Sequence, residues 1–166
     1  MRTMVSKRQS SQEGHKRKFL AVIDATPECG RAVLYAGRRA HNTGGALVLV
    51  FVCPPGDFQH WIGVEEIMRA EAREEAEVAL DKFARYAREK AGIDPELVIR
   101  EGKTVEEICK LIEEDRDIAV LVLAAGDDKE GPGPLVSSIA GRGAAFPIPV
   151  TIMPCDMTDE DIEAVA

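Results

Sequence analysis

The sequence lacks the features of membrane, secreted and nucleic-acid-binding proteins. No apolar run approaches the roughly 18 to 20 residues of a membrane-spanning helix, and the first residues contain no apolar core of a secretory signal. Lys and Arg (21) are outnumbered by Asp and Glu (29), giving a net charge of −8. A nucleic-acid surface needs clustered cations to displace counterions from phosphates. We therefore expect a cytoplasmic protein that binds neither nucleic acid nor a membrane.

Cysteine and histidine are also scarce, with four and three residues respectively. The cysteines are widely spaced, with no CxxC pair and no histidine at zinc spacing, at Cys29, Cys53, Cys109 and Cys155. This pattern indicates reduced thiols rather than a metal site or a disulfide framework. No GxSxG elbow and no recognisable Cys and His signature is present. The sequence shows no catalytic nucleophile with its base.

What is present fits one globular domain with two charged tails. The chain has 166 residues, 45% of them hydrophobic and 30% charged. Its first 18 residues hold six Lys and Arg against a single Glu. We expect a basic, disordered tail over 1–17, a folded domain over 18–155 and an acidic tail over 156–166. Contact of the basic tail with an acidic partner or a membrane is the alternative.

Apolar runs of strand length alternate with helical patterns along the domain. The expected strands cover 19–23, 46–52, 96–102, 117–125 and 146–154. The expected helices begin near Thr26, near Val64, at Thr104 and near Leu135. This order predicts an α/β fold with one five-stranded parallel sheet and helices on both faces.

Helix boundaries carry recognisable signals. Thr26 is a candidate N-cap before Pro27, and Thr104 with Glu107 forms a capping-box pattern. The long helix over 64–90 has apolar residues at helical spacing with Glu and Arg between them, which is typical of a solvated outer face.

Ligands of such folds bind at the carboxyl ends of the strands. Asp24, Val52 and the loop 124–138, "AAGDDKEGPGPLVSS", all lie there. Gly126 and Gly131 have the spacing of a Walker loop, but Pro and Gly follow in place of Lys and Ser or Thr. The turn after the first strand also lacks the glycines of a dinucleotide fingerprint.

The loop leaves two interpretations open. The helix start with Ser137 and Ser138, and the flexible backbone at Gly131 and Gly133, can hold a phosphate. The acidic residues Asp127, Asp128 and Glu130 repel phosphate unless magnesium or Lys129 offsets them. A plain rigid turn, built by the same glycines and prolines, is the other interpretation.

From about Lys18 to Pro154 the chain resembles a universal stress protein. The resemblance rests on "KFLAVIDATPECGRAVLYAGRRA", "ALVLVFVCPP", "REGKTVEEICKLIEE" and "FPIPVTIMP", in this order. It implies a five-stranded α/β fold and a homodimer paired through the last strand, Val150–Met153. The family includes members that bind ATP and members that do not.

The resemblance also implies site residues. Asp24 and Val52 match the aspartate and valine of the ATP-binding members. The ATP-binding members have a glycine loop whose first glycine corresponds to Ala124 of this chain and whose last glycine corresponds to Val136. Ser137 corresponds to the Ser or Thr after that last glycine, and the segment between the two ends is one residue shorter in this chain. The implied nucleotide site is Asp24, Val52, Ala124, Gly126, Gly131, Gly133, Ser137 and Ser138.

Three hypotheses result. The first is a stress protein that binds ATP or another adenine nucleotide, alone or with Mg²⁺, in a regulatory role. The second is a dimeric interaction protein without a nucleotide, whose loop 124–138 is only a rigid connection. The third is an enzyme with weak ATP hydrolysis.

Overall fold

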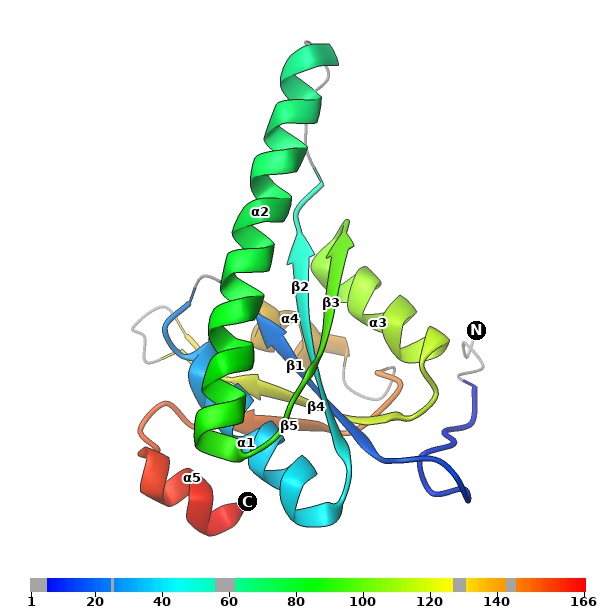
Figure 1. The fold of residues 1–166 in the computed structure, drawn as a ribbon, viewed down its shortest axis with the longest axis vertical. Helices are drawn as coiled ribbons and strands as arrows, with labels where there is room; N and C mark the ends of the chain where they lie inside the picture. Colours follow the sequence, from blue (N-terminus) through cyan, green and yellow to red (C-terminus); the bar gives the residue numbers. More distant parts are fainter. Residues whose placement is uncertain (1–5, 25, 56–61, 127–130, 143–145) are drawn as a thin grey trace.

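The computed structural model describes residues 6–24, 26–55, 62–126, 131–142 and 146–166. Its five strands form one parallel sheet in the order β3-β2-β1-β4-β5 (Figure 1). They are β1 (Lys18–Ile23), β2 (Ala46–Cys53), β3 (Glu96–Glu101), β4 (Ile118–Ala124) and β5 (Val150–Met153). The predicted five-stranded parallel α/β fold is confirmed.

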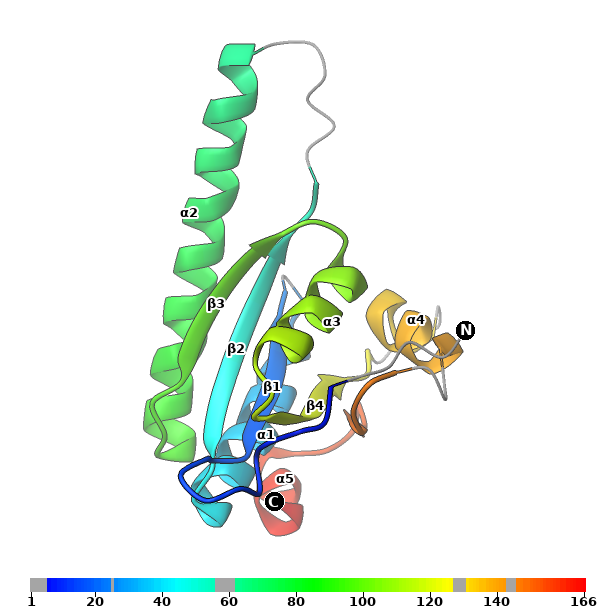
Figure 2. The same cartoon turned by 90° about the vertical axis from the view of Figure 1, so that its right-hand side faces the viewer.

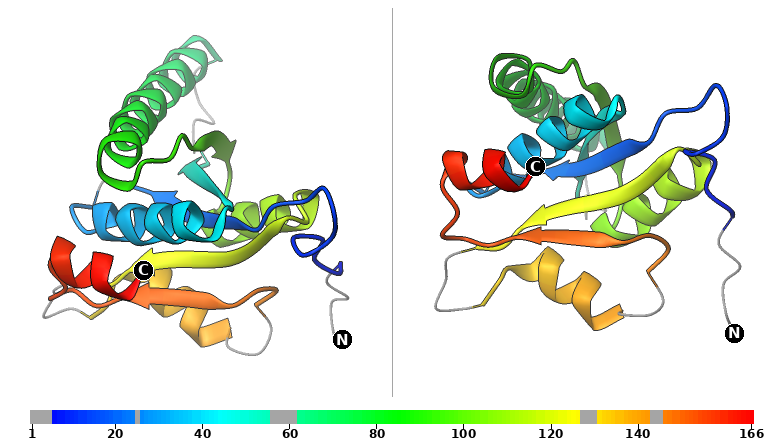
Figure 3. Two further views of the ribbon diagram at one scale, coloured as in Figure 1. Left: turned by 60° about the horizontal axis from the view of Figure 1, so that its bottom comes forward. Right: turned by 90° about the horizontal axis from the view of Figure 1, so that it is seen from below.

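The sheet is covered on both faces, as Figure 3 shows. The helices are α1 (Cys29–Thr43), α2 (Ile62–Tyr86), α3 (Thr104–Glu114), α4 (Pro134–Arg142) and α5 (Asp159–Val165). Alternate β1 residues enter two separate cores: Phe19 packs with residues of α1 and α2, whereas Leu20 packs with residues of α3 and α4. Burial on both faces explains why β1 and β2 are continuous apolar runs.

Helix α2 extends beyond the sheet (Figures 1 and 2). Ala76 and Leu80 are buried where it crosses the sheet, but Ile67 is 61% exposed. The N-terminal part of the helix passes the ends of β2 and β3, so its apolar residues have no sheet to cover. A π-helical turn, η1 (Ala87–Ala91), ends the helix at Gly92, whose φ of 68° is left-handed.

Residues 6–17 differ from the disordered tail that their composition predicts. Arg8 donates through Nη1 to the carbonyl oxygen of Ile112 at 2.5 Å, and the amide of Gln9 donates to the carbonyl of Arg116 at 2.8 Å. Helix α3 has no basic residue in its last turn. Arg8 supplies a cation to carbonyls that the helix itself leaves without partners.

The acidic C-terminal segment also folds onto the domain. Thr158 and Asp161 form a capping box at the start of α5, and Ile162 is fully buried in the core beside α1. The charge of this segment therefore lies on the outer side of a short docked helix.

Candidate functional site

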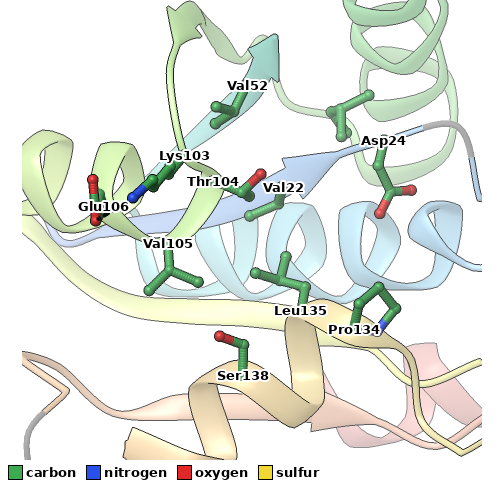
Figure 4. A pocket seen from close by; sticks show the side chains of 11 residues that line it. Val22, Asp24, Val52, Lys103, Thr104, Val105, Glu106, Pro134, Leu135 and Ser138 are labelled. Atoms are coloured by element: carbon green, nitrogen blue, oxygen red, sulfur yellow. Dashed lines mark ion pairs between the residues drawn. The ribbon is translucent and has the colours of Figure 1, made fainter. Parts of the chain in front are cut away.

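A cavity of about 450 Å³ opens at the carboxyl ends of β1 and β2. The strand order reverses between β1 and β4, which is where open α/β sheets bind ligands. The cavity lies between the first turns of α3 and α4 (Figure 4). It is lined by Val22, Ile23, Asp24, Val52, Lys103, Thr104, Val105, Glu106, Pro134, Leu135 and Ser138.

Asp24 stands at one end of the cavity and organises the turn after β1. Its Oδ1 accepts hydrogen bonds from the backbone amide of Thr26, at 2.8 Å, and from the Thr26 hydroxyl. Thr26 is therefore not the N-cap that the sequence predicts. Helix α1 begins at Cys29 instead, without a side-chain cap. Within the described residues, Asp24 Oδ2 accepts no hydrogen bond and is available to a ligand.

The walls of the cavity are apolar. Val52 is 9% exposed and packs in the core with Val22 and with residues of α3 and α4. Val105 and Leu135 line the same space from the two helices. A flat, weakly polar group such as a nucleobase suits such a surface.

The first turn of α3 adds residues that the sequence analysis did not assign to the site. Lys103 and Glu106 lie at the end of the cavity opposite Asp24, and Thr104 lies between them and Asp24, beside Val22 (Figure 4). The predicted capping box is absent because Thr104 is already helical and Lys103 is the N-cap. Glu107 is instead buried and accepts a hydrogen bond from Lys110 at 2.9 Å. The sequence signal for this part of the site is "GKT" between a strand and a helix.

The other residues predicted for the site belong to the loop between β4 and α4 and to the start of α4, and they do not all line the main cavity. Ala124 and Gly133 line a smaller hollow of about 70 Å³ beside the main cavity, with Asp24 between the two. The amide of Gly126 donates to the carbonyl of Pro132 at 3.1 Å, which closes the base of the loop. Gly131 has a φ of 105° and Gly133 one of 104°, so both need glycine.

The two serines of α4 have different environments. Both serines are exposed, but Ser138 lines the main cavity, whereas Ser137 lines neither the cavity nor the hollow. Successive residues of a helix point about 100° apart, so only one of the pair can face the cavity. The acidic residues with which magnesium was expected to pair, Asp127, Asp128 and Glu130, lie outside the described residues.

Cys29 borders the smaller hollow, and its carbonyl-facing thiol donates weakly to Asp24 O at 3.8 Å. Burial raises the pKa of this thiol to about 11, so it is neutral at physiological pH and a poor nucleophile.

No group of three or more His, Cys, Asp and Glu side chains suited to a metal ion occurs in the described part of the chain. None of the described helices is long and apolar enough to cross a membrane.

Comparison with known proteins identifies relatives of the whole domain. The family model of the universal stress protein family matches residues 16–154. No curated protein matches the chain by sequence. Among solved structures, the universal stress protein UspA from Lactobacillus plantarum is 14% identical, with a TM-score of 0.68 over 82% of this chain and 97% of its own.

Two further similar structures are complexes with adenine nucleotides. A universal stress protein from Archaeoglobus fulgidus in complex with dAMP is 16% identical, with a TM-score of 0.59 over 82% of this chain and 96% of its own. A family protein from Arabidopsis thaliana with AMP bound is 18% identical, with a TM-score of 0.58 over 87% of this chain and 94% of its own. The model of the universal stress protein family covers most of the length of this chain, and the chain therefore belongs to that family.

Proposed function

We propose that this protein binds an adenine nucleotide, with ATP as the physiological ligand, in the cavity between β1, α3 and α4, and that binding is regulatory. One observation carries the proposal: Asp24, Val52 and Ser138, which come from three separate elements, line a single cavity. Its volume of about 450 Å³ is within the range of small-molecule sites.

The lining fits the parts of a nucleotide. The base would lie against Val52 and the apolar side chains of Val22 and Leu135. Asp24 Oδ2 would accept a hydrogen bond from a ribose hydroxyl or from the amino edge of adenine. The phosphates would lie towards Ser138, with Mg²⁺ bound chiefly through the phosphates themselves.

The descriptions of the solved relatives support the ligand class. The Archaeoglobus fulgidus protein is described in complex with dAMP and the Arabidopsis thaliana protein with AMP bound. Both ligands are adenine nucleotides, and both proteins share the fold of this chain. A regulatory role fits the absence, among the cavity-lining residues described, of a nucleophile paired with a base.

Calorimetric titration of the purified protein with ATP and magnesium tests the proposal. We expect heat that saturates near one nucleotide per chain, together with a rise in melting temperature. If millimolar ATP produced neither, the protein would instead be an interaction protein without a nucleotide. The hydrogen bond from Gly126 to Pro132 favours that second candidate, because it joins the two sides of the loop through the backbone alone.

We also propose that two chains pair through β5, an edge strand. Pro149 accepts a hydrogen bond from Leu121 of β4, and Met153 accepts one from Ala125, the residue after β4. The backbone groups of Val150 and Ile152 therefore point to the open edge. Ile152 is 42% exposed. Sedimentation should show a dimer that Ile152→Asp dissociates, whereas Val165→Asp, an exposed change on α5, should leave it intact. A monomeric wild-type protein would refute this pairing.

A further inference from the structure

The main cavity contains one cation among its described lining residues, Lys103. The carboxylates of Asp24 and Glu106 line the same space, and the whole chain carries a net charge of −8. A nucleotide brings several more negative charges. Phosphates in such a site need a positive partner, and Lys103 is the side chain placed to provide it.

The described glycines of the loop, Gly131 and Gly133, are poorly placed for the same task. Gly133 lines the hollow of about 70 Å³ rather than the main cavity, and Gly131 lines neither. Pro134, Leu135 and Ser138 of α4 line the main cavity with Lys103, and of these three Ser138 is the one with a side-chain hydroxyl. The space open to phosphates is therefore between Ser138 and the first turn of α3.

The turn that carries Lys103 is held in a defined conformation. Gly102 has a φ of 147°, and a Cβ at this position would lie 2.7 Å from the carboxylate of the buried Glu107. The amide of Gly102 donates to the carbonyl of Cys53 at 3.0 Å. This hydrogen bond ties the turn to the end of β2. Lys103 itself is 76% exposed at its side chain, so its ammonium can move towards a bound anion.

The residue types agree with this role. Gly102, Lys103 and Thr104 join a parallel strand to a helix, and Gly, Lys and Ser or Thr stand at the corresponding junction of a Walker loop. In that loop the lysine reaches the terminal phosphates and the hydroxyl binds magnesium. The first glycine of the Walker pattern is absent here, because Leu97 stands in its place.

We propose that Lys103 binds the phosphates of the nucleotide, with the Thr104 hydroxyl beside it, and that it selects nucleotides over nucleosides. This inference rests on the proposed nucleotide site. It assigns the phosphates to the α3 side of the cavity instead of the glycine loop. Glu106, whose carboxylate lies 3.8 Å from the Lys103 ammonium, competes with the phosphates for it.

Titrations of wild type, Lys103→Ala and Lys103→Arg with ATP, AMP and adenosine test the inference. Lys103→Ala should weaken ATP binding about tenfold or more and leave adenosine unchanged. Lys103→Arg should retain most of the preference for ATP. Lys90→Ala, an exposed change on η1, is the matched control and should bind all three ligands like wild type.

A second variant gives a gain that misfolding cannot imitate. Glu106→Gln should strengthen ATP binding about two- to fivefold, because it removes a competing carboxylate. Equal loss of adenosine and ATP in Lys103→Ala, or ATP binding equal to that of the Lys90→Ala control, would overturn the role of Lys103 while nucleotide binding stands. Failure of wild type to bind any of the three ligands would overturn the proposed function and this inference together.

Discussion

The backbone amide of Thr26 donates to Oδ1 of Asp24 at 2.8 Å, and the same Asp24 lines the main cavity. Mutation can separate the structural role of this residue from the binding role that we propose for it. Oδ1 fixes the chain, whereas Oδ2 is the atom proposed to accept a ligand hydrogen bond.

Asp24→Asn separates these roles. The amide oxygen of Asn can still accept from Thr26, but its NH₂ group replaces Oδ2 and cannot accept from a ribose hydroxyl. We expect the free energy of unfolding to change by less than about 0.5 kcal/mol and ATP affinity to fall about tenfold. Denaturant unfolding and calorimetry measure the two effects. Unchanged affinity would show that Oδ2 does not contact the ligand.

Arg8→Ala should destabilise the domain. Its side chain is 18% exposed and donates to the C-terminal carbonyls of α3, which would lose a charged donor. We expect a loss of about 1–3 kcal/mol in the free energy of unfolding. Lys7→Ala, an exposed neighbour, should change it by less than about 0.5 kcal/mol. Equal effects of the two variants would mean that residues 6–17 do not dock in solution.

Gly102→Ala should be costly in both conformation and space. Its φ of 147° disfavours any side chain, and the new Cβ would meet the carboxylate of Glu107. We expect a loss of about 1–3 kcal/mol in the free energy of unfolding. Gly63→Ala, in α2 with nothing within 4 Å of the added Cβ, should instead be neutral or stabilising by up to about 1 kcal/mol. A neutral Gly102→Ala would contradict the close approach of Glu107.

The buried thiol of Cys29 predicts a pH dependence. Burial raises its pKa from 9.0 to about 11, so the unfolded chain loses this proton at lower pH than the folded one. The stabilisation is complete below pH 9 and is lost as pH rises towards 11, by at most about 3 kcal/mol. Comparing unfolding of wild type and Cys29→Ala from pH 8 to 11 isolates this proton. A difference in the free energy of unfolding between wild type and Cys29→Ala that stays constant from pH 8 to 11 would refute the predicted pH dependence.

Sequence reasoning was most accurate where a local pattern suffices. Alternating apolar runs predicted the sheet, and their ends placed Asp24 and Val52 at one edge of it. The approach of α3 to the cavity depends on the strand order β3-β2-β1-β4-β5, which alternation alone does not specify. Lys103 and Glu106 were therefore missed, although the "GKT" signal was present in the sequence.

Other differences have equally specific causes. Ser137 and Ser138 are adjacent residues of the same type, so the sequence does not say which of them faces the cavity. The orientation of α4 about its own axis places Ser138 there. The docking of residues 6–17 depends on carbonyls at the end of α3, over a hundred residues away in sequence. Charge counts do not report tertiary contacts of this kind.

The central claim is that an adenine nucleotide occupies the cavity beside Ser138. Calorimetric titration of ATP into wild type, Ser138→Trp and Ser137→Trp tests it most directly, because adjacent helix positions receive the same side chain and only Ser138 lines the cavity. We expect wild type and Ser137→Trp to bind ATP with similar affinity and Ser138→Trp to lose binding. ATP binding by Ser138→Trp equal to that of wild type, or no binding by wild type at millimolar ATP, would contradict the claim.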